Sequence, residues 1–395
     1  MSKLLASHVF TSESVGEGHP DKVCDQISDA ILDAVLALDS EAHVAAETAV
    51  GRNLCVNIGE IKCRDWDKVD TRTIAREVCR EIGYDRPEEG FSYDTFIYIN
   101  NLHRQSGDID QGVSSVRPED QGAGDQGMMF GYACSSTPEL MPAPIMLSHK
   151  LLQRLTEIRK GTSDIPYLRP DSKAQVSVLH ENGIAKSLTS VVISHQTEDV
   201  PIEQIRRDLE EVARQILAPT GMLTNDTEFY INPTGRFVVG GPCGDSGLTG
   251  RKIIVDSYGG VGSHGGGAFS GKDPSKVDRS AAYYARYAAK NIVAAGLAEK
   301  CEIQVAYAIG IAKPFGINVS TFGTARVPEE KIAQMLMSDE VFDFRPGMLV
   351  RELQLTSPRG WSYRDTSNYG HFGRDLFPWE KLDKVDAIKS ALGVK

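Results

Sequence analysis

The sequence lacks the cysteine patterns of a disulfide scaffold or a zinc protein. Its seven cysteines form no CxxC pair, and their number is odd. We therefore expect reduced, mostly packed thiols. The 395 residues also contain no uninterrupted apolar run near the ~18 residues that a membrane span needs. Residues 1–10 show no signal-peptide pattern, so we expect a cytoplasmic protein with no membrane partner.

The sequence has fewer basic than acidic residues. It contains 43 Lys and Arg residues and 54 Asp and Glu residues, which gives a net charge of −11. Such a chain is a poor general binder of nucleic acid or anionic membrane, so any anion site must be local. The 41% hydrophobic and 25% charged residues are typical of a folded globular protein. The length predicts two or three domains.

Hydrophobic periodicity predicts helices and strands that are mixed, with hairpins in place of strict strand–helix alternation. We expect helices over 20–38, 69–82, 144–159, 201–216 and 277–297. We expect strands over 44–50, 54–61, 95–100, 175–180, 184–193, 229–231, 237–240, 252–256, 302–309 and 318–322. The Asn182-Gly183 pair between two strand patterns is a strong hairpin signal. The chain is therefore predicted to be α+β.

Some segments carry no clear period. Residues 12–18 are expected to form a loop that leads into the first helix. On that helix, Asp25, Ser28 and Asp29 lie off the apolar face, so we expect them on the surface. Residues 101–127 lack any regular signal, and a structureless stretch of this length inside a compact domain is usually functional, often a lid.

Glycine is abundant in three motifs that resemble nucleotide-binding loops. Segments 122–127 and 260–265 both fit GxGxxG, but neither opens directly into a predicted helix, which disfavours a dinucleotide-binding fold. Segment 266–272 matches a P-loop up to its lysine, but Asp273 replaces the Ser or Thr that would hold magnesium. The free backbone amides and neighbouring lysines still form a good cradle for phosphate oxygens.

Charged residues also stand beside glycine or proline where core packing cannot explain them. The segments are 19–22, 169–173, 232–237, 244–252 and 271–278. Taken alone, a histidine and an aspartate before a helix are usually a cap and a solvated neighbour. Together with the other segments, His19 and Asp21 indicate a polyphosphate and metal site, with cations for the phosphates and carboxylates for magnesium.

With these motifs in view, the chain resembles the S-adenosylmethionine synthetase (methionine adenosyltransferase) family. The resemblance extends from residues 10–15 to residues 369–374, and segments 122–127 and 265–273 match the family's signatures without a gap. It implies three similar α+β domains with approximate threefold symmetry, in which helices pack on mixed sheets and the chain crosses between domains. The corresponding sequence segments are 1–105, 118–238 and 239–380.

The resemblance implies a reaction of ATP with L-methionine that gives S-adenosylmethionine, followed by hydrolysis of the tripolyphosphate to diphosphate and phosphate. The chemistry agrees with the residue types. A thioether sulfur carries no proton, so its attack on C5′ needs alignment and a stabilised leaving group, not a general base. Concentrated cations and magnesium would stabilise that leaving group.

Site residues follow from the resemblance position by position. Catalytic roles fall on His19, Lys173, Arg251 and Lys272, and His19 meets the triphosphate near the breaking bond. The ATP site comprises His19, Asp171, Ser172, Lys173, Arg236, Phe237, Asp245, Arg251, Lys252, Ala268 and Lys272. The methionine site comprises Glu60, Gln105, Asp125, Asp245 and Lys276. The implied metal ligands are Asp21 and Asp278 for Mg²⁺ and Glu47 for K⁺, and residues 105–116 coincide with the family's mobile loop.

The resemblance also implies a homo-oligomer, commonly a dimer of dimers, with active sites between subunits. Two alternatives stay open. A P-loop kinase or ATPase would use segment 266–272 as its phosphate loop, but Asp273 argues against it. A nucleotide-sensing module would use the glycine loops only to hold a ligand. Product analysis separates the three, because a kinase leaves ADP and a sensor has no turnover.

Overall fold

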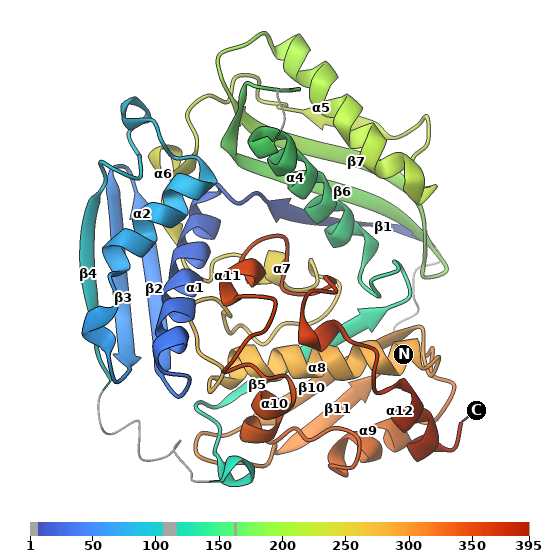
Figure 1. Ribbon diagram of the computed structural model, residues 1–395. Helices are drawn as coiled ribbons and strands as arrows, with labels where there is room; N and C mark the ends of the chain where they lie inside the picture. The colour runs from blue at the N-terminus through green and yellow to red at the C-terminus, as the bar shows by residue number, and fades with distance from the viewer. Residues whose placement is uncertain (1–6, 106–116, 162–163, 395) are drawn as a thin grey trace.

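Three sheets, each covered on one face by helices, surround a common centre in the computed structural model (Figure 1). The structure describes residues 7–105, 117–161 and 164–394. The first sheet has the order β4-β3-β2-β9. Its strands are β2 (His43–Gly51), β3 (Leu54–Lys62), β4 (Ile97–Arg104) and β9 (Gly247–Leu248), and α1 (Pro20–Leu38) and α2 (Thr71–Ile82) accompany them.

The second sheet has the order β1-β6-β7-β8. Its strands are β1 (Ser7–Val15), β6 (Leu168–Glu181), β7 (Ile184–Thr197) and β8 (Glu228–Ile231), and its helices are α4 (Ala143–Gly161) and α5 (Ile202–Leu217). The third has the order β11-β10-β5. It comprises β5 (Gly127–Cys134), β10 (Lys300–Tyr307), β11 (Gly316–Ser320), α8 (Val277–Ala294), α9 (Glu329–Met337), α10 (Pro346–Glu352) and α12 (Val385–Leu392).

Short elements complete the described chain. Three short helices are α6 (Gly241–Gly244), α7 (Ile253–Asp256) and α11 (Tyr363–Thr366), and Figure 1 shows α7 and α11 between the three units. Single 3-10 turns lie at Trp66–Lys68, Pro87–Glu89, Pro118–Asp120, Ala218–Thr220 and Pro378–Glu380. No described helix is long and apolar enough to cross a membrane. All seven cysteines are free thiols, as predicted, and five of them are buried.

Each sheet contains a strand from a distant part of the chain. The N-terminal β1 pairs antiparallel with β6, β9 pairs with β2, and β5 pairs with β10. Spatial units therefore differ from consecutive sequence segments. The α+β class, the three similar units with approximate threefold symmetry, the mixed sheets packed by helices and the crossing chain are all confirmed.

The predicted surface position of Asp25, Ser28 and Asp29 on α1 is wrong, because all three are fully buried. The helix lies between its own sheet and the centre of the molecule, so a second face of it is covered (Figure 1). Polar partners make this burial possible. Arg279 Nη1 donates to Asp29 Oδ1 at 2.7 Å, and Ser28 shares a 2.8 Å hydrogen bond with Thr48.

Local patterns predicted hairpins correctly and some isolated strands wrongly. Asn182 and Gly183 both have positive φ, as the hairpin between β6 and β7 requires. The predicted strand over 237–240 is absent. Its backbone contact with β7 is an isolated hydrogen bond, in which Thr197 N donates to Phe237 O at 2.9 Å, and no strand ladder forms.

Three more predictions at this scale need correction. Residues 252–256 form the short helix α7 in place of a strand, because Asp256 turns inward to a buried ion pair with Lys22. The predicted loop over 12–18 is a strand as far as Val15, paired with Lys173 on β6. The sequence patterns did not predict strand β5.

Candidate active site

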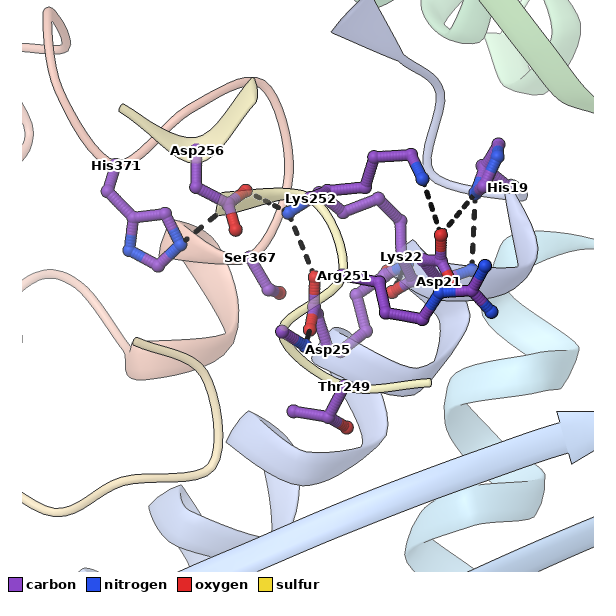
Figure 2. Close-up of polar contacts among 12 residues, drawn as sticks. His19, Asp21, Lys22, Asp25, Thr249, Arg251, Lys252, Asp256, Ser367 and His371 are labelled. Carbon is purple, nitrogen blue, oxygen red and sulfur yellow. Dashed lines mark hydrogen bonds and ion pairs between the residues drawn. The ribbon is translucent and has the colours of Figure 1, made fainter. Parts of the chain in front are cut away.

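His19 and Asp21 lie at the N-terminus of α1, where the sequence places a cap and an acid in the first turn. His19 is the N-cap, and its Nδ1 accepts the backbone N–H of Asp21 at 3.1 Å (Figure 2). A backbone N–H can only donate, so Nδ1 is an acceptor and the neutral ring carries its proton on Nε2. Burial, together with the charges of Lys252 and Lys173, lowers the pKa of His19 to about 3 despite the opposing effect of Asp21. His19 is therefore a neutral Nε2–H donor.

Asp21 stays ionised beside two cations. Its Oδ2 accepts Lys252 Nζ at 2.5 Å, its Oδ1 accepts the backbone N–H of Leu248 at 3.0 Å, and Arg251 Nε lies 3.7 Å from Oδ1. Burial raises the pKa of Asp21, but the hydrogen bonds from Lys252 and Leu248 outweigh burial and hold the pKa below its ordinary value. Arg251 and Lys252 are thus gathered at the positive end of α1, where anions bind favourably.

Lys173 and Asp171 reach the same place from β6. Lys173 is exposed, and its charge lowers the pKa of His19 and opposes the rise at Asp171. Burial raises the pKa of Asp171 to about 6, although its Oδ2 accepts the Gly241 N–H at 2.8 Å. Its other oxygen, Oδ1, is buried with no protein partner, so it is available to a ligand donor.

The remaining predicted ATP residues surround this group less tightly. Asp245 is exposed but close enough to raise the pKa of Asp171. Ser172 is buried, and its carbonyl accepts the Gly16 N–H at 2.8 Å. Arg236 is exposed and forms an ion pair with Asp199 at 3.1 Å. Phe237 is half-buried, and its carbonyl accepts a hydrogen bond from the backbone N–H of Thr197. Ala268 lies against Gly250, and a Cβ added to Gly250 would overlap the Ala268 side chain.

A second group of predicted residues lines a separate cavity of about 360 Å³. Its walls include Glu60, Gln105, Asp125, Lys272, Lys276 and Asp278. Lys272 Nζ lies 2.6 Å from Asp278 Oδ2, and Gln105 Nε2 donates to Glu60 Oε1 at 3.2 Å. Carboxylates and ammonium groups therefore share this cavity, as a zwitterionic ligand requires.

The two groups do not merge within the described chain. The cavity walls include neither His19 nor Asp21, and Asp245, predicted for both substrates, is also outside them. Gly271, next to Lys272, donates its N–H to Asp29 at 2.8 Å. Asp29 is eight residues from Asp21, which along a helix is about 12 Å. The structure therefore contains two partial sites, one at the N-terminus of α1 and one beside β2 and β3.

The predicted metal ligands are three carboxylates, Asp21, Asp278 and Glu47. Among the described residues no three His, Cys, Asp or Glu side chains form a metal cluster. Asp21 and Asp278 each contact a lysine instead. Magnesium commonly uses one or two carboxylates and completes its shell with substrate phosphates and water, so these acids fit such an ion. Glu47 is exposed on β2 and shares one sheet face with Glu60 on β3.

Sequence reasoning missed a buried polar network directly behind the first group. Lys22 pairs with Asp25 and Asp256, and His371 Nε2 lies 3.9 Å from Asp256 Oδ1 (Figure 2). The i,i+3 spacing of Lys22 and Asp25 was the available signal, but Asp256 is 234 residues away in sequence. The predicted mobile loop covers residues 105–116. Of these, only Gln105 belongs to the described part of the chain.

The fold and these sites define a class: an α+β protein of three sheet-and-helix units with clustered cations for an anion beside a carboxylate-rich cavity. Family models of S-adenosylmethionine synthetase match almost the whole chain, with the N-terminal domain over 7–107, the central domain over 120–237 and the C-terminal domain over 239–381. The chain belongs to the S-adenosylmethionine synthetase family.

Two relatives show how far the similarity extends. The chain is 54% identical over 389 residues to the S-adenosylmethionine synthase of Treponema denticola, covering 97% of this chain and 98% of the relative. It is 55% identical over 394 residues to the S-adenosylmethionine synthase of Clostridium botulinum, covering 96% and 98%. The similarity therefore includes all three units.

Proposed function

We propose that this chain synthesises S-adenosylmethionine from ATP and L-methionine and then hydrolyses the tripolyphosphate to diphosphate and phosphate. One observation carries the proposal beyond family membership: Lys173, Arg251 and Lys252 converge on a neutral histidine at the N-terminus of a helix. That arrangement suits an anion whose charge grows during the reaction. An acidic protein binds such an anion only where it concentrates its cations.

The reaction needs alignment and charge stabilisation. The sulfur lone pair forms the S–C5′ bond while the C5′–O bond breaks, and its electron pair leaves on the triphosphate oxygen. The Nε2–H of His19 would donate to that oxygen, and Arg251, Lys252 and Lys173 would bind the other phosphate oxygens. Lys272 would meet the same phosphates from the second partial site.

Substrate recognition is divided between the two partial sites. We assign the nucleoside to Asp171, Phe237 and Asp245, with Ser172, Arg236 and Ala268 around it. The cavity suits methionine, because Glu60 and Asp125 would attract its ammonium, Lys276 would attract its carboxylate, and Gln105 orients Glu60. This division fits a zwitterion beside a polyanion.

Mg²⁺ and K⁺ are the proposed metal ions. Asp21 and Asp278 would hold Mg²⁺, and Glu47 would hold K⁺. When bound, magnesium supplies positive charge to the phosphate oxygens. The ion pairs of Asp21 with Lys252 and of Asp278 with Lys272 place both carboxylates beside the phosphate-binding cations.

We further propose a homo-oligomer, a dimer of dimers, in which each active site combines partial sites from two subunits. The uncovered face of the first sheet supports this, since it exposes Ile58, Ile97 and Ile99 beside Glu60. Exposed apolar patches of this kind usually mark an interface. The cytoplasmic location and the segments 1–105, 118–238 and 239–380 stay predictions.

Product analysis tests the proposed function. Purified protein is incubated with ATP, L-methionine, Mg²⁺ and K⁺, and the sulfonium product is detected by mass, with diphosphate and phosphate measured in equal amounts. ADP as the product would favour the P-loop alternative, and ligand binding without turnover would favour the sensor. Asp273 already opposes the P-loop alternative, because its carboxylate accepts Val44 N at 2.7 Å and Lys276 Nζ at 2.6 Å.

A further inference from the structure

A buried ammonium lies directly behind the phosphate-binding cations. Lys22 follows Asp21 on α1, and its side chain is fully buried. Its Nζ donates to Asp25 Oδ2 at 3.0 Å and also to Asp256 (Figure 2). Because none of the side chain is exposed, Lys22 cannot touch a bound substrate, and any effect on the reaction must act through other residues.

The two carboxylates bracket the segment that carries Arg251 and Lys252. Asp25 Oδ1 accepts the backbone N–H of Gly250 at 2.8 Å, one residue before Arg251. Asp256 is the last residue of α7, and its own N–H donates to the Lys252 carbonyl at 2.8 Å. The segment is therefore attached at both ends, through one carboxylate each, to the same ammonium.

We propose that Lys22 is a positioning residue that fixes Arg251 and Lys252 against the departing phosphates; this inference rests on the proposed function. Packing alone does not hold Arg251, whose side chain is 49% exposed. Without the ammonium, two buried carboxylates, Asp25 and Asp256, would face each other uncompensated. The segment would then shift away from α1, and both cations would lose their alignment with His19.

The test is Lys22→Met in the full chain, because methionine is an unbranched side chain only one atom shorter than lysine and carries no charge. The single-turnover rate of sulfonium formation should fall about 100-fold, as expected when catalytic groups are displaced by about 1 Å. The affinity for inorganic tripolyphosphate, measured by calorimetry, should also fall. The KM for methionine should stay within about twofold, because its proposed residues lie in the other partial site. Lys22→Arg should restore much of the rate, because arginine can bridge two carboxylates.

A matched control separates positioning from general loss of a buried cation. Lys290 on α8 is 4% exposed and lies 2.8 Å from Glu380 Oε2. Lys290→Met should lower the melting temperature as Lys22→Met does, yet leave the rate and tripolyphosphate affinity unchanged. Equal rate losses in both variants, or an unchanged rate in Lys22→Met, would overturn the inference.

A second variant covers the case in which Lys22→Met does not fold. Asp256→Asn keeps the size of the side chain and removes one of the two carboxylate charges that face the Lys22 ammonium. It should show the same pattern of a lower single-turnover rate with an unchanged KM for methionine. An unchanged rate would contradict the inference. If the parent protein forms no sulfonium product, the proposed function fails as well; if the parent is active and these variants match it, only the inference fails.

Discussion

His19 is a neutral side chain close to Lys173 and Lys252. Burial and the charges of Lys252 and Lys173 keep its ring unprotonated, and the Asp21 N–H fixes its tautomer. A neutral Nε2–H adds little attraction for an anion in the ground state. In the role that we propose for His19, the hydrogen bond from Nε2–H strengthens as negative charge develops on the departing oxygen. It would therefore stabilise the transition state more than the ground state.

His19→Asn should therefore slow the displacement at C5′ and leave ATP binding largely intact. The loss of one preorganised donor lowers such a rate by roughly 100-fold, about 3 kcal/mol. Rapid-quench single turnover measures the rate, and equilibrium binding measures ATP affinity. His180→Asn, on the half-buried end of β6, is the control and should behave as the parent. An unchanged single-turnover rate in His19→Asn would remove the proposed role.

Asp21→Asn should raise the magnesium concentration needed for half-maximal activity. Asparagine keeps one oxygen but loses the charge that attracts the ion and also frees Lys252 from its 2.5 Å contact. Metal titration at saturating ATP measures the shift, and Asp226→Asn, at an exposed position, provides the control. Identical titration curves for Asp21→Asn and the parent would show that Asp21 does not hold the metal.

His195 on β7 supplies a test of how a buried histidine affects stability. Burial lowers the pKa of His195 to about 4, while its ring donates to the Gln196 carbonyl at 2.9 Å. The unfolded chain gains a proton near pH 6.5 and the folded chain does not, so this group stabilises the fold fully above pH 6.5 and progressively less as the pH falls towards 4.

His195→Gln should therefore destabilise the protein less at pH 5 than at pH 8. The linkage predicts a difference of about 2 kcal/mol between these two pH values. Thermal melting of parent and variant across this range measures it. Thr197→Val removes a neighbouring buried polar group that does not titrate, so its effect should not depend on pH. A constant difference for His195→Gln would refute the linkage.

Sequence patterns indicated the residues that we propose bind the ligands, but not the residues buried behind them. His19, Asp21 and Lys272 belong to short motifs that place charged or polar residues beside glycine or proline, where core packing does not explain them. Asp25 was predicted to lie on the helix surface, and no role behind the site was predicted for Lys22. Their partners Gly250 and Asp256 are more than 220 residues away in the sequence. A local period contains no information about such partners.

At the level of elements, close backbone contact decides how helices meet sheets. Gly131 on β5 faces α8, and a Cβ at this position would overlap the carbonyl group of Ala285. The strand and the helix therefore approach more closely than any side chain allows. This requirement also explains why β5 escaped prediction: its glycines weaken the alternating pattern that identifies a strand.

Gly131→Ala should push β5 away from α8 and destabilise the protein by about 1–3 kcal/mol, the usual effect of overpacking. Urea unfolding or thermal melting measures the loss. Gly316→Ala on β11 is the matched control, since an added Cβ there meets nothing within 4 Å. Equal stability of Gly131→Ala and the parent would show that the contact is not tight.

Elements whose partners are adjacent in sequence were the predictable ones. The β2–β3 and β6–β7 hairpins and the amphipathic helices follow local periods and turn residues. Strands β1 and β9 pair with segments more than 150 residues away, and α7 replaces a predicted strand because Asp256 reaches Lys22. Long-range pairing overrides local propensity at these places.

For the whole molecule, the main consequence of the crossing chain is that each unit contributes to more than one site. Lys252 and Lys272 are 20 residues apart in sequence, but they belong to different partial sites. If one active site needs both, the missing half must come from a second copy. A closed twofold arrangement of two chains would then form two equivalent sites, each with His19 from one chain and Lys272 from the other.

Hybrid oligomers test this arrangement. His19→Asn and Lys272→Ala should each abolish most activity alone. In a hybrid dimer, one site contains both substitutions and the other contains neither, so the hybrid regains one working site. Random mixing of equal amounts makes half of the dimers hybrid and should restore about a quarter of the parent's activity. Two different affinity tags would isolate the hybrids and confirm that they form. If isolated hybrids stay inactive, His19 and Lys272 act within the same chain, and the gap between the two partial sites must close by a change of conformation instead.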